Sequence, residues 1–324
     1  MPTTIRTGGP ATRARHAFRS AVLVACVAAV AACSGTGSSP SAGVAPDGLV
    51  ALVAMGDSTS LLGWNATAAK AVPIKLPKGD TTWIATGRAD VLAAALANGT
   101  TATSDPVHLG KALLWRQVKA VGASGDAPKG HQDFVSWDPE GGRYATLAGD
   151  LLSGDGIAVV LIDPSALTAF EIPIDRSVVA APPVWIGPDR LVVVTGDASA
   201  PRATIVDTET GDLSDGPVGP RLLAASADGR RVATMDAPGD PIVIRDTDAW
   251  LGGDGSSVAS ISPPSGSTSA IAFALDAGGQ RFVVAWQAND GSVSLSVYDR
   301  KSDWHRVSKP SIGTAKGAVV AWRR

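Results

Sequence analysis

Short apolar runs, each broken by Gly, Asp, Asn or Pro, follow one another along the chain from Asp47 onward. No long stretch shows the 3.6-residue apolar period of an amphipathic helix. Short apolar runs bounded by turn-forming residues are typical of β-strands. The hydrophobic pattern therefore predicts a mainly β domain over residues 47–324.

These runs recur as a repeated unit. Four segments show the repeat, and they begin at Phe134, Pro183, Leu223 and Ile271. In each segment the pattern predicts a strand, a tight Gly/Asp turn, a second strand, another turn, a third strand that ends in Asp, and a shorter outer strand.

Two markers set the register of the repeat. A large residue opens most units, at positions 40 to 54 residues apart: Trp83, Trp137, Trp185, Ala225 (a smaller counterpart), Phe273 and Trp322. An acidic residue closes the third strand at Asp163, Asp207, Asp246 and Asp299, with Asn65 and Arg116 as the counterparts in the first two units.

A four-stranded unit that repeats every 40 to 50 residues is typical of a β-propeller blade. The six markers predict an all-β propeller of six four-stranded blades, with five and seven blades as the alternatives. Residues 317–322 (GAVVAW) resemble an opening strand, and residues 49–55 (LVALVAM) resemble a second strand without an opening strand before it. We therefore expect the C-terminal strand to close the ring by pairing with the first blade.

Composition supports the β interpretation. The 30 acidic residues comprise 27 Asp and only 3 Glu, and the chain holds 36 Gly and 22 Pro. Asp, Gly and Pro favour turns, whereas Glu favours helices. The excess of Asp over Glu is thus typical of a domain with many short turns.

The first 32 residues differ from the rest and predict a signal peptide. They carry four Arg and no acidic residue, and residues 21–32 form an apolar run of twelve, too short to span a bilayer comfortably. The run ends in Val30-Ala31-Ala32-Cys33, which resembles the lipobox of bacterial lipoproteins. An ordinary secretory signal followed by a chance Cys is the alternative.

The lipobox resemblance implies cleavage before Cys33, a diacylglyceryl group on its thiol, and further acylation, for example by palmitate, of the new amino terminus. It places the protein on the extracytoplasmic side of the bacterial cell membrane, held through lipid on Cys33. Residues 33–46 would then be the lipidated Cys and a flexible tether rich in Ser, Gly and Pro.

Removal of the leader changes charge and thiol content. The part from Cys33 onward has 24 basic and 30 acidic residues, a formal net charge of −6. This balance argues against a nucleic-acid partner. No Cys follows Cys33, so disulfides, thiolate metal sites and Cys nucleophiles are excluded for residues 34–324.

One repeat resembles a known family. Residues 225–233 (ASADGRRVA), followed by residues 242–246 (IVIRD), resemble the repeat of TolB-like bacterial propellers. Residues 137–141 (WDPEG) are a second copy. The likeness covers residues 134–324 and implies a binding platform of WD-like architecture without saying what it binds.

A catalytic alternative begins at residues 55–60 (MGDSTS), which resemble the nucleophile block of Gly-Asp-Ser esterases with Ser58 as nucleophile. Such enzymes also need a late Asp-x-x-His, and Asp303-Trp304-His305 is one residue short of it. Gly-Asp pairs also occur at Gly149 and Gly196, in the same predicted turn of other units, which favours a turn role.

No catalytic, cofactor or metal site is predicted elsewhere. His108, His131 and His305 are far apart in sequence, and none of the Asp clusters matches a calcium loop. The Asp residues that close third strands are expected to accept hydrogen bonds from the next turn. Trp250 and Trp304 fall outside the register, in predicted outer loops, and are the expected partner contacts.

The sequence thus predicts a lipid-anchored propeller that binds an envelope protein or ligand without catalysis. The alternatives are an envelope hydrolase that uses Ser58 and a propeller with a small molecule in its axial channel.

Overall fold

The computed structural model describes residues 49–55, 58–62, 72–73, 77, 81–87, 91–107, 113–151, 153–179, 181–197, 199–308 and 317–322. The predicted signal peptide, Cys33 and the tether lie outside the described residues. Within them no helix is long and apolar enough to cross a membrane.

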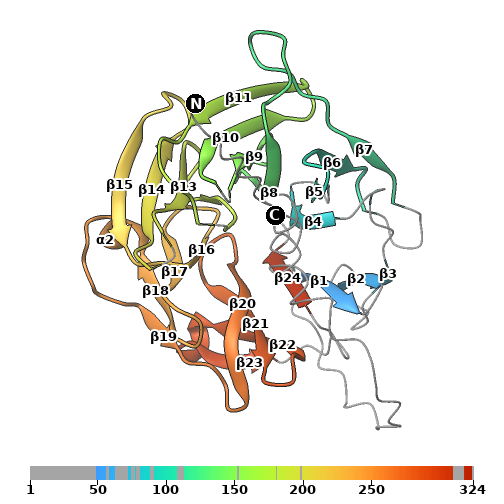
Figure 1. The fold of residues 1–324 in the computed structure, drawn as a ribbon. Helices are drawn as coiled ribbons and strands as arrows, with labels where there is room; N and C mark the ends of the chain where they lie inside the picture. The colour runs from blue at the N-terminus through green and yellow to red at the C-terminus, as the bar shows by residue number, and fades with distance from the viewer. Residues whose placement is uncertain are drawn as a thin grey trace, which may run out of the picture.

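The described strands form a β-propeller, as predicted, with five blades of consecutive strands, the lower alternative to the six that the markers predicted. Five four-stranded antiparallel blades consist of consecutive strands, with the first strand of each innermost (Figure 1). The first two blades are β4 (Thr81–Thr86), β5 (Leu92–Leu96), β6 (Thr101–Ser104) and β7 (Trp115–Gln117), then β8 (His131–Trp137), β9 (Tyr144–Asp150), β10 (Asp155–Asp163) and β11 (Thr168–Pro173).

The other three consecutive blades follow the same plan. They are β12 (Val184–Trp185), β13 (Arg190–Thr195), β14 (Arg202–Asp207) and β15 (Leu213–Val218); β16 (Leu222–Ala225), β17 (Arg231–Met235), β18 (Ile242–Asp246) and β19 (Ala259–Ile261); and β20 (Ser267–Leu275), β21 (Arg281–Ala288), β22 (Val293–Asp299) and β23 (His305–Ser308). The short helix α2 (Thr247–Leu251) follows β18, and the 3₁₀ turn η2 (Arg300–Ser302) follows β22.

A further four-stranded sheet is composite. It joins β24 (Gly317–Trp322) to β1 (Leu49–Met55), β2 (Ser58–Leu62) and β3 (Val72–Pro73), in that order. Six residue pairs, from Leu49 with Trp322 to Ala54 with Gly317, hold β24 antiparallel to β1. The predicted pairing of the last strand with the first is therefore confirmed, and this sheet differs from the five consecutive blades in its connectivity.

The core lies between neighbouring blades. In β21, Phe282, Val284 and Trp286 face the β16–β19 blade, whereas Val283 and Ala285 pack with Trp322 of β24. Both faces of a middle strand are buried, so its sequence is a continuous apolar run and does not alternate. Full burial of one such side chain contributes about 1.5–3 kcal/mol, and this term holds the ring together.

The Asp residues at the ends of third strands act as predicted in three blades. Asp163 accepts hydrogen bonds from the Ser165 and Ala166 amides, and Asp299 accepts one from Lys301. Asp207 accepts two such bonds at 2.9 Å, from Glu209 and Thr210, and these bonds lower the pKa of its carboxyl group. The carboxylates stabilise turns.

Two positions of this marker differ from the prediction. Asp246 precedes α2 and makes no capping bond; its carboxylate instead lies 3.2 Å from the Arg231 guanidinium. Arg116 lies within β7, a fourth strand, and the true counterpart is Asp105, whose carboxylate accepts from the Leu114 amide. The predicted first member, Asn65, lies outside the described residues.

We predict that deletion of residues 317–324 abolishes cooperative folding. The deletion removes the β24–β1 pairing and the buried Val320 and Trp322 side chains, a loss of roughly 5 kcal/mol or more. Urea denaturation monitored by circular dichroism measures the loss, and deletion of residues 323–324 alone is the control. Equal midpoints for the two truncated proteins would show that β24 is dispensable.

Candidate functional site

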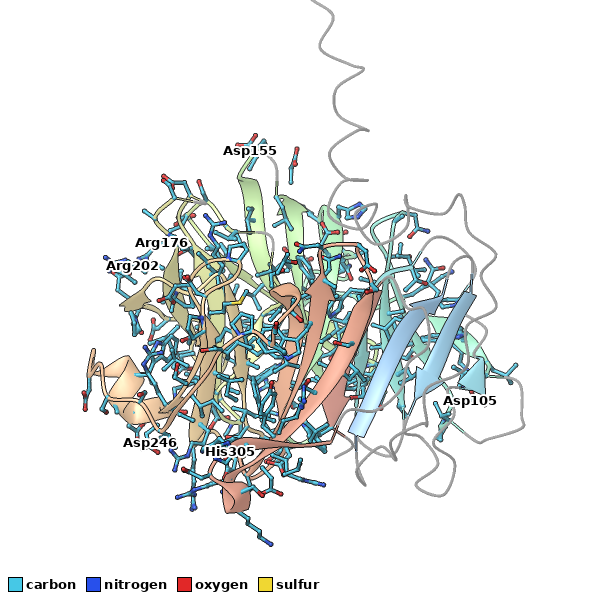
Figure 2. All side chains as sticks on the ribbon, turned by 90° about the horizontal axis from the view of Figure 1, so that it is seen from below. Asp105, Asp155, Arg176, Arg202, Asp246 and His305 are labelled. Atoms are coloured by element: carbon cyan, nitrogen blue, oxygen red, sulfur yellow. The ribbon has the colours of Figure 1, made fainter. Side chains whose placement is uncertain are left out.

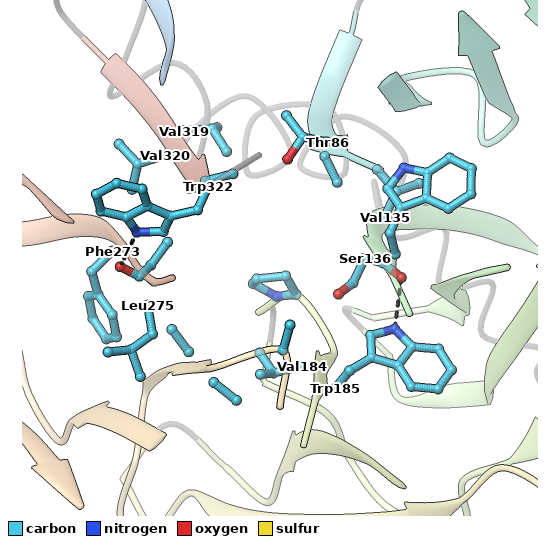
Figure 3. A pocket seen from close by; sticks show the side chains of 18 of the residues that line it. Thr86, Val135, Ser136, Val184, Trp185, Phe273, Leu275, Val319, Val320 and Trp322 are labelled. Carbon is cyan, nitrogen blue, oxygen red and sulfur yellow. Dashed lines mark hydrogen bonds between the residues drawn. The ribbon is translucent and has the colours of Figure 1, made fainter. Parts of the chain in front are cut away.

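The inner strands of the five blades and of the composite sheet surround one cavity of about 170 Å³ (Figure 3). It is lined from β4, β8, β12, β16, β20 and β24, every fourth strand of the chain. The lining residues are Trp83 to Thr86, Val135 to Trp137, Pro182 to Trp185, Leu223 to Ala225, Ala227, Phe273 to Leu275, Ala277, and Val319 to Trp322.

The two faces of the ring are distinguished by their connections. Turns between the first and second strands of each blade, and links between the third and fourth strands, lie on one face, called here the 1–2 face. Turns between the second and third strands lie on the other, the 2–3 face. Ala227 and Ala277 belong to first-to-second turns, so the cavity lies toward the 1–2 face.

Equivalent residues form a ring at this end of the inner strands. Each is the last residue of its first strand to pair with the second strand: Thr86, Trp137, Trp185, Ala225, Leu275 and Trp322. Four of them are the predicted opening residues. The other two predicted residues, Trp83 and Phe273, lie three residues before Thr86 and two residues before Leu275. On those two strands the ring position itself has no aromatic side chain, and a large residue precedes it.

Two of the tryptophans bind the preceding blade in the same way. The Trp185 indole nitrogen donates to the Ser136 carbonyl at 2.9 Å, and that of Trp322 donates to the Ala274 carbonyl at 3.1 Å. Ser136 and Ala274 occupy equivalent positions, each one residue before the ring. Figure 3 shows both bonds at the cavity wall.

An arginine of the preceding blade completes each of these contacts. The Arg143 guanidinium lies 5.3 Å from the centre of the Trp185 ring, and that of Arg281 lies 4.5 Å from the Trp322 ring. An aspartate holds each arginine: Asp276 lies 3.0 Å from Arg281, and Asp138 lies 3.6 Å from Arg143. The repeated Asp–Arg–Trp unit is called here the interblade latch.

Other junctions on this face use glycine. A Cβ atom at Gly279 would lie 2.5 Å from Cγ of Arg231, and one at Gly229 would lie 2.6 Å from the Ile186 carbonyl oxygen. Both glycines have positive φ angles, 62° and 71°. These two junctions lead to Leu275 and Ala225, two of the three ring positions without an aromatic ring, and there a glycine packed against the preceding blade replaces the indole.

No charged side chain lines the cavity among the described residues. Its polar side chains are Thr86 and Ser136, and no hydrogen bond joins either hydroxyl to another residue of the described part. The wall is otherwise formed by indole, aliphatic, proline and alanine side chains. Such a site can bind an apolar group and orient it by one or two hydrogen bonds.

The residues of the esterase hypothesis are not brought together. Ser58 begins β2, the third strand of the composite sheet, and pairs with Met55 at the end of β1, on the 2–3 face. His305 begins β23, a fourth strand, on the 1–2 face. Figure 2 shows Asp155, which begins the third strand of its own blade as Ser58 does, at the opposite end from His305.

The Gly-Asp pairs of other blades lie where the second strand leads to the third, as predicted. Gly149-Asp150 forms the end of β9, and Gly196-Asp197 follows β13 in the link to β14. The Asp197 carboxylate accepts bonds from the Ser199 and Ala200 amides, and these bonds, with one from the Ser199 hydroxyl, lower the pKa of Asp197.

The two predicted partner contacts lie in the core. Trp250 is only 5% exposed and packs on Val192, Leu223 and Val232. Trp304, 8% exposed, packs with Phe282 and Tyr298. The prediction of surface positions was wrong, because α2 turns Trp250 inward and Trp304 adopts a φ of 58° at the start of the outer strand.

Possible metal ligands are also dispersed. The described residues contain no group of three or more His, Cys, Asp or Glu side chains that could hold a metal ion. His131 contacts a single carboxylate, that of Asp133, at 3.3 Å. His108 lies outside the described residues.

Comparison with known proteins places the fold. No family model and no curated protein matches the sequence significantly. Among solved structures, TolB from Acinetobacter baumannii has a TM-score of 0.60 at 14% identity, over 85% of this chain and 66% of that chain. A chain of the nidogen/laminin complex has a TM-score of 0.56 at 12% identity, over 85% of this chain and 98% of that chain.

A protein from Lactobacillus plantarum also matches, with a TM-score of 0.52 at 15% identity over 86% of each chain. At these identities the likeness shows the fold alone, and this chain spans about two thirds of the TolB chain. The chain is therefore a β-propeller with TolB-like structural neighbours.

We predict that Arg281→Ala lowers the free energy of unfolding by about 1–2 kcal/mol. The change removes the cation–π contact to Trp322 and the charged bond to Asp276, both of them partly exposed. Arg281→Lys should recover only part of the loss, because an ammonium group does not stack as a guanidinium does. Urea denaturation measures each change.

The exposed Arg306 offers a matched control, and Arg306→Ala should change stability by no more than about 0.5 kcal/mol. If Arg281→Ala and Arg306→Ala proved equally mild, the interblade latch would have no energetic role.

Proposed function

We propose that this protein is a lipid-anchored, extracytoplasmic propeller that binds an envelope protein or ligand on its 1–2 face and catalyses no reaction. We further propose that the composite sheet of β24, β1, β2 and β3 acts as a sixth blade. The observation that carries the proposal is the cavity that opens among the inner strands toward the 1–2 face.

Three features support a binding role over catalysis. The cavity wall combines aromatic and aliphatic side chains with two hydroxyl groups, which suits recognition. It holds no His, Asp, Glu, Lys or Cys within the described residues, so the lining offers no general base to activate the Ser136 or Thr86 hydroxyl. The neighbours share only the propeller fold, which hosts many binding functions.

The anchor follows from the amino-terminal sequence. Basic region, apolar run and lipobox occur in the order that a lipoprotein leader requires, and Cys33 is the only Cys from that point onward. Two or more acyl chains hold a protein on a membrane, at about 0.8 kcal/mol per buried CH₂ group. The tether of residues 34–46 would let the propeller reach partners close to the membrane surface.

We predict that Cys33→Ser moves the protein out of the lipid-bound state. In bacteria fed radiolabelled palmitate, the unchanged protein should carry label and the Cys33→Ser variant none. Cys26→Ser, in the part of the leader that would be removed, is the matched control and should keep the label. Equal labelling of all three proteins would overturn the lipid attachment at Cys33.

A second prediction concerns the binding face. A photocrosslinking amino acid placed at the exposed Ala277, beside the cavity on the 1–2 face, should capture a discrete partner in intact cells. The same amino acid at the exposed Asp155, on the 2–3 face, is the control and should capture less. Mass spectrometry of the purified adducts gives the readout.

Capture from position 155 alone would place binding on the opposite face. No adduct from either position, in cells where the protein is folded and membrane-bound, would count against the platform itself.

A further inference from the structure

We infer that the axial cavity binds an uncharged small molecule that consists of one or two rings and bears a hydroxyl or carbonyl group. The inference rests on the proposed binding function and names the chemical class of its ligand. Four observations carry it: the lack of charge in the wall, the volume, the placement of the two hydroxyls, and the alanines of one sector.

The lack of charge excludes ionic ligands. No acidic or basic side chain lines the cavity in the described part of the chain. Two arginines of the described part that contact ring tryptophans also pair with aspartates: Arg143 contacts Asp138 and Trp185, and Arg281 contacts Asp276 and Trp322. A charged ligand would lose hydration without gaining a counter-ion, which is costly.

The volume sets the size of the ligand. A dry apolar cavity of about 150 Å³, engineered in another protein, accepts benzene. The cavity of about 170 Å³ between the inner strands is slightly larger. It therefore suits a single substituted ring or a small fused pair.

The hydroxyls set its polarity. Thr86 and Ser136 come from β4 and β8, neighbouring inner strands, and Figure 3 shows them on one side of the cavity with Phe273 and Leu275 opposite. Both hydroxyls lack partners among the described residues, so they can donate to, or accept from, a single polar group on the ligand. The apolar side would hold the ring.

The alanines explain where the space lies. Ala225 occupies a ring position where the equivalent residues are Trp137, Trp185 and Leu275. Ala224, Ala225 and Ala227 of one blade and Ala274 and Ala277 of the next all line the cavity, beside the larger Leu223, Phe273 and Leu275. A larger residue at position 225 should occupy the same space as the ligand.

The test uses the full-length protein in detergent, with phenol as the probe and with toluene and benzoate as its apolar and charged analogues. Isothermal titration calorimetry against protein-free detergent, together with the shift in melting temperature, measures binding. Phenol should bind and raise the melting temperature, toluene should bind more weakly, and benzoate should bind at least about tenfold more weakly than phenol.

Two variants locate the site. Ala225→Leu should weaken phenol binding by about tenfold or more, and it should fold because Leu275 occupies the equivalent position. Ala166→Leu, in an exposed turn, is the matched control and should bind as the unchanged protein does. Thr86→Val keeps the shape of the side chain and should weaken phenol binding about fivefold while leaving toluene unaffected.

The inference falls if phenol gives neither heat nor a thermal shift with folded protein, or if benzoate binds as well as phenol. It also falls if the folded Ala225→Leu and Thr86→Val variants bind phenol as the unchanged protein does. That result would show that phenol binds in the detergent or at another place on the protein. Capture of a partner from position 277 without phenol binding would remove only this inference and leave the proposed function standing.

Discussion

The structure depends on the fact that a twisted four-stranded sheet with two apolar faces cannot bury both by itself. Each blade must therefore pack between two neighbours, and the middle strands, such as β21, contribute one set of side chains to each side. A row of such sheets would leave two exposed apolar faces at its ends. The composite sheet removes this problem, because β24 pairs with β1 and presents Trp322 to the β20–β23 blade, so the last unit in the chain completes the first.

The same constraint shapes the 1–2 face, where blades contact each other next to the axis. Where the ring residue is Trp185 or Trp322, its indole reaches the carbonyl and the arginine of the preceding blade. Where it is Ala225, Gly229 of the turn lies against the Ile186 carbonyl of the preceding blade, and where it is Leu275, Gly279 lies against the Arg231 side chain. At Trp137 a glycine and an indole meet, since a Cβ atom at Gly87 of the preceding blade would be 2.6 Å from the indole. The ring residue and the turn glycine together thus determine which contact joins two blades.

Local pattern was sufficient for the fold but only partly for the site. The strand repeats, the Gly-Asp turns and the closure by residues 317–322 follow from periodicity and turn chemistry, which short segments of sequence contain. The same local signals misplaced Trp83, Phe273 and Arg116, because bulges and loops of unequal length shift the register between blades. Trp250 and Trp304 were assigned to the surface because they lie outside the repeat, yet burial depends on packing from other strands, which periodicity does not report. The predicted opening residues of the repeat do line the cavity, but the rest of its wall could not be predicted without the register of every inner strand.

The latch and the cavity have a common cause. An indole at the end of an inner strand can either fill the axis or lie against the preceding blade, and hydrogen bonds to Ser136 and Ala274 hold Trp185 and Trp322 in the second arrangement. The bulk that would otherwise close the channel is thereby used to join blades, and alanines remain around much of the axis. Removal of an indole from the ring would then weaken the junction between blades as well as change the cavity wall. Stability and the shape of the binding site are therefore coupled through the same few residues, so a substitution that enlarges the cavity at Trp185 or Trp322 also loosens the ring that defines it.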